Sequence, residues 1–218
     1  NNNPTSAGMS MMNQTNDAAR FNTSAKRDST DNHWDFTALA HYKIDATQDI
    51  EFGLARKVRS PNLYERYSWS TANMMAIMNN FVGDGNGYIG NPDLKPEKAH
   101  TLSATFDWHD AERRRELKLT PHYSHVTDYI DAIQWDNVSN TARTTPLRNQ
   151  FTTLRYANQT ARLYGVDLSG QLPLANTAWG EFGLKGLLSY VRGKNTDTGD
   201  DLYNIMPLNA KLTFTHKI

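Results

Sequence analysis

Regular alternation of apolar and polar residues is the feature that most constrains this chain. Between positions 34 and 44 every second residue is apolar, from Trp34 through Phe36 to Tyr42. The residues between them are polar except Leu39: Asp35, Thr37, His41 and Lys43. The same period of two recurs at 50–57, 98–108, 115–135, 151–172, 179–192 and 208–215. A period of two is typical of strands with one apolar and one polar face. The sequence therefore predicts an all-β, antiparallel fold of about seven strands.

One strand changes its phase. In the segment 151–172, Ala161 and Leu163 alternate on odd positions, whereas Val166, Leu168 and Leu172 alternate on even positions. A single extra residue in a strand shifts the phase in this way, and glycine is common at such sites. We therefore expect a β-bulge at Gly165.

The connections between the expected strands alternate in length. Short turns at 45–49, 109–114 and 173–178 separate long polar segments at 58–97, 136–150 and 193–207. A soluble antiparallel sandwich also alternates strands and turns, but long loops confined to one side are uncommon in compact soluble domains. Transmembrane β-barrels of the bacterial outer membrane have short periplasmic turns and long extracellular loops. The pattern favours a transmembrane β-barrel with its long loops outside the cell.

Composition excludes several other classes of protein. The 23 basic and 23 acidic residues cancel, and no basic block recurs, so we expect no nucleic-acid partner. The absence of cysteine excludes disulfides and thiol chemistry. Only 38% of the chain is hydrophobic, and no apolar run approaches the roughly 20 residues of a membrane helix. No catalytic or nucleotide-binding motif is present, so we expect neither an enzyme nor a bound cofactor.

Two sequence motifs carry a family resemblance: RSPNLYE at 59–65 and GNPDLKPE at 90–97. Together with RLYGVDLSGQLPL at 162–174 and DLYNIMPLNAKLTF at 201–214, they resemble the barrel of TonB-dependent outer-membrane receptors, most closely the copper receptors of Gram-negative bacteria. The resemblance implies location in the outer membrane, contact with its lipid, and uptake of a scarce ligand powered by the TonB complex. Copper, as the ion or a chelate, is the favoured cargo.

The resemblance also implies parts that this chain lacks. The family has an N-terminal plug with a TonB-contacting segment (the TonB box) and a closing strand, and its barrels have about 22 strands. An open edge in lipid leaves backbone groups unpaired at several kcal/mol each. We therefore expect 1–33 to be an extracellular loop segment and 34–218 to be a partial barrel, as a piece of a longer chain. Contact with TonB would pass through the missing plug.

Six methionines lie in two polar segments and are candidate copper ligands. Thioether sulfur suits Cu(I), although methionine also fills gaps in packed cores, and the sequence leaves both interpretations open. His100 is a candidate partner for these sulfur atoms, whereas His122 and His125 should point to opposite faces of one strand and cannot chelate one ion together. The candidate methionines are Met9, Met11, Met12, Met74, Met75 and Met78.

Other cargo and another class of protein remain open. Aromatic residues in the segment 58–97 would suit a siderophore or haem, and a passive porin or surface adhesin would need no plug. These aromatic residues are Tyr64, Tyr67, Trp69, Phe81 and Tyr88.

The stretch GDGNGYIG at 83–90 resembles a calcium-binding EF-hand loop but does not meet its requirements. Val82 stands where the first acidic ligand belongs, and Asp93 stands where a bidentate Glu belongs. Pro92 and Pro96 obstruct the helix that should follow. We expect a turn-rich loop in which glycines 83, 85, 87 and 90 supply positive φ angles.

Overall fold

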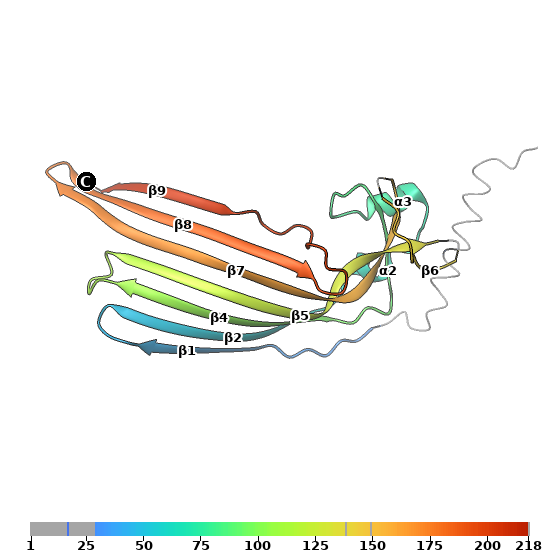
Figure 1. The fold of residues 1–218 in the computed structure, drawn as a ribbon, viewed down its shortest axis with the longest axis horizontal. Coiled ribbons are helices and arrows are strands. Elements are labelled where there is room, and N and C mark those ends of the chain that lie inside the picture. Colours follow the sequence, from blue (N-terminus) through green and yellow to red (C-terminus); the bar gives the residue numbers. More distant parts are fainter. Residues whose placement is uncertain (1–16, 18–28, 138, 149, 218) are drawn as a thin grey trace, which may run out of the picture. The chain divides into compact units, whose positions relative to one another are not determined.

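The computed structural model describes residues 17, 29–137, 139–148 and 150–217. Most of them belong to one antiparallel sheet, whose long strands lie side by side in Figure 1. The strands follow the order β1-β2-β4-β5-β7-β8-β9, while short β3 pairs in parallel with β7 and short β6 pairs with β5. The elements are β1 (Phe36–Lys43), β2 (Gln48–Arg59), α2 (Leu63–Tyr67), α3 (Asn73–Met78), β3 (Gly87–Ile89), β4 (Glu97–His109), β5 (Glu116–Asp136), β6 (Thr141–Ala142), β7 (Thr153–Thr177), β8 (Gly180–Asn195) and β9 (Asn209–Lys217).

The chain forms two compact units, each assembled from several segments. Of the residues that the structure describes, those within 17–33, 59–97 and 128–159 form the first unit, and those within 34–58, 98–127 and 160–217 form the second. The predicted extracellular segment 1–33 lies outside the described residues except for 17 and 29–33. Among the residues that the structure describes, no helix has the length and apolarity needed to cross a bilayer.

The second unit is a sheet with two chemically different faces. Phe36 pairs with Arg56, and Phe106 pairs with Leu119, so the even positions of β1, β2 and β4 share one face with the odd positions of β5. We call this the apolar face and the other the polar face. Leu102 and Leu212 on the apolar face are 59% and 74% exposed. On the polar face, Thr105 and Thr120 hydroxyls lie 3.0 Å apart. The predicted alternation of faces is confirmed.

The first unit contains a small hydrophobic core under the long connection 60–96. Tyr88, Leu94, Ile130 and Tyr156 are all buried and form one cluster, with Leu154 packed against it. The rings of Tyr88 and Tyr156 lie 5.5 Å apart. Because β3 also pairs with the start of β7, the loop is joined to the strands by backbone as well as side-chain contacts. The long connection is therefore folded.

The structure differs from the sequence pattern at two places in β7. β7 continues to Thr177 through the expected turn at 173–178, because Pro173 pairs with Gly183 and Asn176 with Glu181. The expected bulge at Gly165 is wrong on this side of β7, since pairing with β8 is regular there and the register shifts between Pro173 and Ala175. Gly165 is instead a point of close approach: a Cβ would lie 2.3 Å from the Tyr190 carbonyl oxygen and 2.8 Å from His122 Nε2.

Candidate functional site

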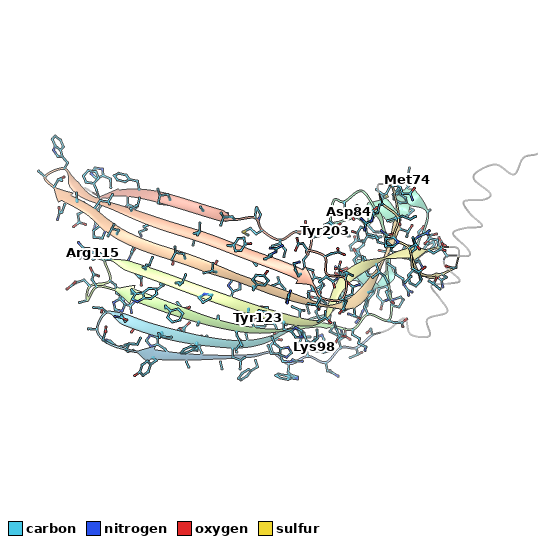
Figure 2. The ribbon with its side chains drawn as sticks, in the orientation of Figure 1. Met74, Asp84, Lys98, Arg115, Tyr123 and Tyr203 are labelled. Carbon is cyan, nitrogen blue, oxygen red and sulfur yellow. The ribbon has the colours of Figure 1, made fainter. Side chains whose placement is uncertain are left out.

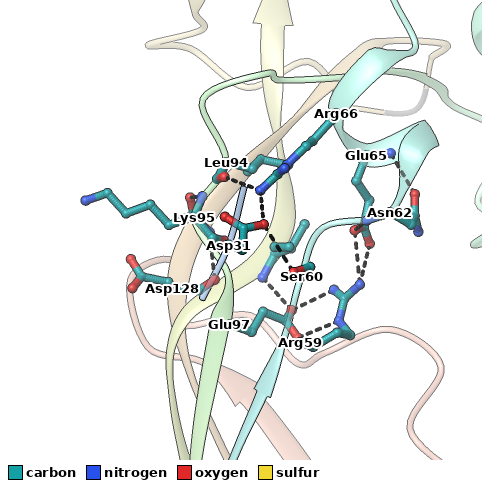
Figure 3. Close-up of polar contacts among 12 residues, drawn as sticks. Asp31, Arg59, Ser60, Asn62, Glu65, Arg66, Leu94, Lys95, Glu97 and Asp128 are labelled. Atoms are coloured by element: carbon teal, nitrogen blue, oxygen red, sulfur yellow. Dashed lines mark hydrogen bonds and ion pairs between the residues drawn. The ribbon is translucent and has the colours of Figure 1, made fainter. Parts of the chain in front are cut away.

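The sequence motifs at 59–65 and 90–97, which carry the family resemblance, contact each other through a network of ion pairs at the base of the long connection (Figure 3). Arg59, the last residue of β2, donates from Nε and Nη2 to the Glu97 carboxylate at 2.7 and 2.9 Å. Its Nη1 donates to Glu65 at 3.0 Å. Bidentate arginine–carboxylate pairs fix geometry as well as charge. The two ends of the segment 60–96 are therefore held together by one guanidinium group.

Glu65 also begins helix α2. The Glu65 amide donates to Asn62 Oδ1, and the Asn62 amide donates back to Glu65 Oε2, each at 2.8 Å. This is a capping box, which satisfies two amides at a helix start. The residues Asn62 to Glu65 therefore start helix α2 and also supply an ion-pair partner for Arg59.

A buried arginine and a glycine attach the segment 90–97 to helix α2. Arg66 is buried and donates from Nη2 to Asp31 at 2.7 Å and to the Leu94 carbonyl oxygen at 3.3 Å. Gly90 lies so close to α2 that a Cβ would stand 2.7 Å from the Arg66 carbonyl group. The Asn91 amide donates to the Glu65 carbonyl oxygen at 2.8 Å. Gly90 is therefore required by packing.

The segment 80–88 is organised around Asp84. Its carboxylate accepts hydrogen bonds from Asn80 Nδ2 at 2.9 Å, Asn86 Nδ2 at 2.8 Å and Tyr88 Oη at 2.9 Å. Burial opposes ionisation, but these hydrogen bonds outweigh it and lower the pKa of Asp84 below its usual value. The protein's own donors occupy the carboxylate, which agrees with a turn rather than an ion site.

The expectation for the four glycines is only half correct. Gly83 and Gly85 have positive φ angles of 84° and 77°, whereas Gly87 and Gly90 do not. Gly87 is needed for space, because a Cβ there would lie 2.7 Å from the Ala76 Cβ atom. Sequence alone could not separate these two uses of glycine.

Helix α3 carries three of the candidate copper ligands (Figure 2). Ala76 is completely buried, whereas the exposed fractions of Met74, Met75 and Met78 are 77%, 46% and 70%. The small alanine packs against Gly87, and the three thioethers face solvent. Met9, Met11 and Met12 lie outside the described residues.

His100 has a different neighbour from the one expected. It stands on the apolar face of β4 in the second unit, directly opposite His125 of β5, and both are exposed. His122 lies on the polar face, with Nδ1 3.8 Å from Asp167 Oδ2. The expected opposition of His122 and His125 is confirmed, and the pairing of His100 with methionine stays a prediction.

Sequence reasoning missed a polar cluster beside the short turns. Asp49, Asp107 and His109 bring three ligand-type atoms within 4.8 Å of one another. Arg113 bridges the two carboxylates, with Nη2 2.6 Å from Asp49 and Nη1 2.9 Å from Asp107. This internal cation balances the acids, so the cluster functions as an ion-pair network of the polar face. The sequence contains a hint of this cluster, because Asp107 and His109 are two residues apart and therefore lie on the same, polar face of one strand.

Comparisons with known proteins identify the class. Residues 8–217 match the family model described as TonB dependent receptor-like, beta-barrel, and the chain belongs to this family. The family consists of outer-membrane receptors of Gram-negative bacteria that transport ligands, and it is not a family of enzymes. The predicted fold class, a partial transmembrane β-barrel, is confirmed.

Solved structures with the same fold have different cargo. The copper transporter OprC is 18% identical with a TM-score of 0.58, over 84% of this chain and 24% of that one. The siderophore receptor PirA from Acinetobacter baumannii is 17% identical with a TM-score of 0.58, over 85% and 27%. The ferric enterobactin receptor PfeA from Pseudomonas aeruginosa is 20% identical with a TM-score of 0.54, over 83% and 25%.

The chain thus spans about a quarter of the length of these solved structures. A search of curated protein sequences found no match.

Proposed function

We propose that this chain is the cargo-capturing part of a TonB-dependent copper receptor. The observation that carries the proposal is the exposure of Met74, Met75 and Met78 on α3. This helix lies in a long connection, and long connections of outer-membrane barrels are expected on the extracellular side. Ala76 packs the helix, so the thioethers are left to face solvent, which costs apolar burial. Thioether sulfur is a soft ligand suited to Cu(I). The expected metal ligands are therefore these three residues, with Met9, Met11, Met12 and His100 as further candidates.

The test separates sulfur from apolar bulk. Met74, Met75 and Met78 are replaced together by Leu in the full-length receptor, and Cu(I) binding is measured by competition with a chromogenic chelator. Leu keeps a similar volume, so loss of affinity by tenfold or more, about 1.4 kcal/mol, would report loss of ligand atoms. Met206→Leu is the matched control, because Met206 is an exposed methionine of another loop. Equal copper affinity in the triple variant and the control would reject the proposal.

Uptake of a siderophore is the second candidate. Tyr64 and Phe81 form an exposed edge-to-face pair with ring centroids 5.0 Å apart. Exposed aromatic rings favour a flat, conjugated chelate over a bare ion. Replacing both by Ala should lower the affinity for a ferric catecholate siderophore if this candidate is correct, and leave Cu(I) binding unchanged. Family membership places the chain with receptors rather than with passive porins or adhesins.

A further inference from the structure

The polar cluster beside the short turns contains the donor atoms of a metal site. Asp49 stands at the start of β2, and Asp107 and His109 stand at the end of β4, all on the polar face of the second unit. Each residue offers one ligand-type atom, and the three atoms lie within 4.8 Å of one another. Two carboxylates and one imidazole form a donor set that suits first-row transition metals such as Zn²⁺.

The ring of His109 has the orientation of a metal-binding imidazole. Its Nδ1 atom lies 2.9 Å from the carbonyl oxygen of Asp110. A carbonyl oxygen can only accept a hydrogen bond, so the neutral ring carries its proton on Nδ1 and a lone pair on Nε2. Histidines that bind metals almost always donate their other N–H in this way, which fixes the ring and its tautomer.

The lone pair of His109 faces a second acceptor. Nε2 lies 3.3 Å from Asp49 Oδ2, and the two side chains are only 5% and 6% exposed. Two acceptor atoms at this separation need a cation to bridge them, which is either a proton on Nε2 or a metal ion. The position between His109 and Asp49 is therefore built for a cation.

One oxygen of each carboxylate is also buried without a donor. In the part of the chain that the structure describes, Asp49 Oδ1 and Asp107 Oδ1 are shielded from solvent and have no hydrogen-bond partner. The two residues are 5% and 8% exposed. A buried polar atom without a partner costs free energy. These oxygens are coordination sites that the chain's own donors do not fill.

The surrounding charges favour a dication. Arg113 binds the other oxygen of each carboxylate, at 2.6 Å from Asp49 Oδ2 and 2.9 Å from Asp107 Oδ2. Lys118 and Glu116 form an ion pair at 2.9 Å and cancel each other. Arg113 thus supplies one positive charge against two buried carboxylates, which leaves one negative charge in excess. Its side chain is 47% exposed, so it can move aside when an ion enters.

A fourth ligand lies within reach of the same position. His41 of β1 stands on the polar face with Nε2 3.6 Å from Asp49 Oδ2, and its side chain is 57% exposed. An exposed side chain can change its rotamer to turn toward an ion. With His41 the cluster has the four nitrogen and oxygen ligands of a tetrahedral zinc centre.

We propose that Asp49, Asp107 and His109 bind a divalent transition-metal ion of the zinc type, with His41 as the fourth ligand. The ion joins β1 and β2 to β4, where the His109 amide already donates to the Thr47 carbonyl oxygen at 2.8 Å. It therefore stabilises the strands at the end that carries the short turns. The inference is separate from the methionines of α3 and does not depend on the cargo.

The first test compares two histidines of the polar face. The full-length receptor is purified in detergent, freed of any histidine tag and stripped of metal with a chelator. Binding of Zn²⁺ is measured by calorimetry for the wild type and for His109→Gln. The matched control is His122→Gln, because His122 also faces a carboxylate, with Nδ1 3.8 Å from Asp167 Oδ2, but belongs to no three-ligand group among the described residues.

We expect Zn²⁺ to bind the wild type and His122→Gln with equal affinity, and His109→Gln at least about tenfold more weakly. Zn²⁺ should also raise the Tm of the wild type, because a ligand that binds only the folded state stabilises it. Mg²⁺ at the same concentration should not, because it prefers oxygen ligands to imidazole. Equal Zn²⁺ affinity in the two variants, or equal stabilisation by Mg²⁺, would overturn the proposal.

The second test separates a metal site from a network of ion pairs alone. Arg113→Gln leaves the two buried carboxylates without their guanidinium partner, so this variant should unfold at a lower temperature than the wild type. Zn²⁺ should restore its Tm, and the double variant Arg113→Gln with His109→Gln should lose this rescue. If variants of His109 do not fold, Asp107→Asn replaces His109→Gln with the same expected losses. A proton on His109 Nε2 in place of a metal ion predicts no rescue by Zn²⁺, and that result would also reject the site.

Discussion

Arg59 and Glu97 stand 38 positions apart in the sequence and form a bidentate ion pair, with Nε–Oε2 at 2.7 Å and Nη2–Oε1 at 2.9 Å. The pair closes the long connection at its base, where β2 ends and β4 begins. Holding the two ends of a loop together lowers the entropy that the loop would otherwise retain. Breaking the pair should therefore make the loop more flexible.

We predict that Glu97→Gln loosens the connection without unfolding the sheet. The Arg59 side chain is 47% exposed, although Glu97 is only 12% exposed, so removing the Glu97 charge should cost about 1–2 kcal/mol, less than for a fully buried pair. Limited proteolysis of the full-length receptor should show faster cleavage within 60–96, while heat-modifiable mobility stays normal. Asp35→Asn is the control, since its ion pair with Lys57 is exposed at both ends. Equal cleavage in both variants would contradict the role given to Glu97.

Gly90→Ala should disturb the same loop through sterics alone. The new methyl group would lie 2.7 Å from the Arg66 carbonyl carbon and oxygen, and backbone atoms cannot move aside cheaply. A cost of about 1–3 kcal/mol is expected, as for other overpacked sites. Gly85→Ala meets no atom within 4 Å and pays only for its positive φ, roughly 1 kcal/mol. Hydrogen exchange of the peptide 60–70 should increase in Gly90→Ala and stay unchanged in Gly85→Ala.

The order of the segment 80–88 should depend on pH through Asp84. The folded-state pKa of Asp84 lies below its value in an unfolded chain, because Asn86, Tyr88 and Asn80 donate to the ionised carboxylate. Its stabilisation is therefore complete above the unfolded pKa of about 3.9 and is lost as the pH falls through the folded value. Hydrogen exchange of this peptide, corrected for intrinsic rates, should rise as the pH falls below about 4. Asp84→Asn should remove that dependence, and a dependence that persists in this variant would exclude Asp84 as its source.

The faces of the sheet predict where a charge is tolerated. Phe106→Arg on the apolar face should cost about 2–4 kcal/mol near the middle of a membrane. Thr105→Arg, one residue away, points to the polar face beside Thr120 and should fold. Leu212 and Thr213 of β9 form a second such pair. The readout is heat-modifiable mobility, and failure of the two Thr variants with survival of the others would mean that the faces are reversed.

The orientation of the chain can be tested at the two ends of β5. We predict that Thr145, in the long connection after β5, lies outside the cell, and that Glu112, in the short turn before it, lies in the periplasm. Single cysteines at these positions of the full-length receptor are treated on intact cells with a thiol reagent that cannot cross the membrane. Labelling of Glu112→Cys but not of Thr145→Cys would show the opposite topology.

Sequence pattern predicted most of the sheet because each strand of the second unit has one apolar and one polar face. It was wrong where residues typical of turns are nevertheless paired with a neighbouring strand. Pro173 and Asn176 read as turn residues, yet both pair with β8, so β7 continues through them. The change of phase near Gly165 arises from different surroundings, since Ala161 is completely buried on one face and Leu172 is exposed on the other.

The candidate site was predictable only in part. The exposure of Met74 and Met78 required knowledge that Ala76 makes the buried contact of α3. The pairing of His100 with His125 depends on the register between β4 and β5. Register between strands distant in sequence is set by tertiary contacts such as Gly165 against His122, which no single strand's pattern contains.

The attachment of α3 through Ala76 allows the exposed residues of this helix to change during evolution. One small residue, seated against Gly87, fixes the helix, while Met74, Met75, Ile77 and Met78 all point outward. Mutations at these four outward positions leave the Ala76 contact intact, so they can accumulate at little cost to folding. Selection can thus exchange one ligand chemistry for another on the same helix, and a protein engineer could graft new binding residues at these positions while leaving the scaffold untouched.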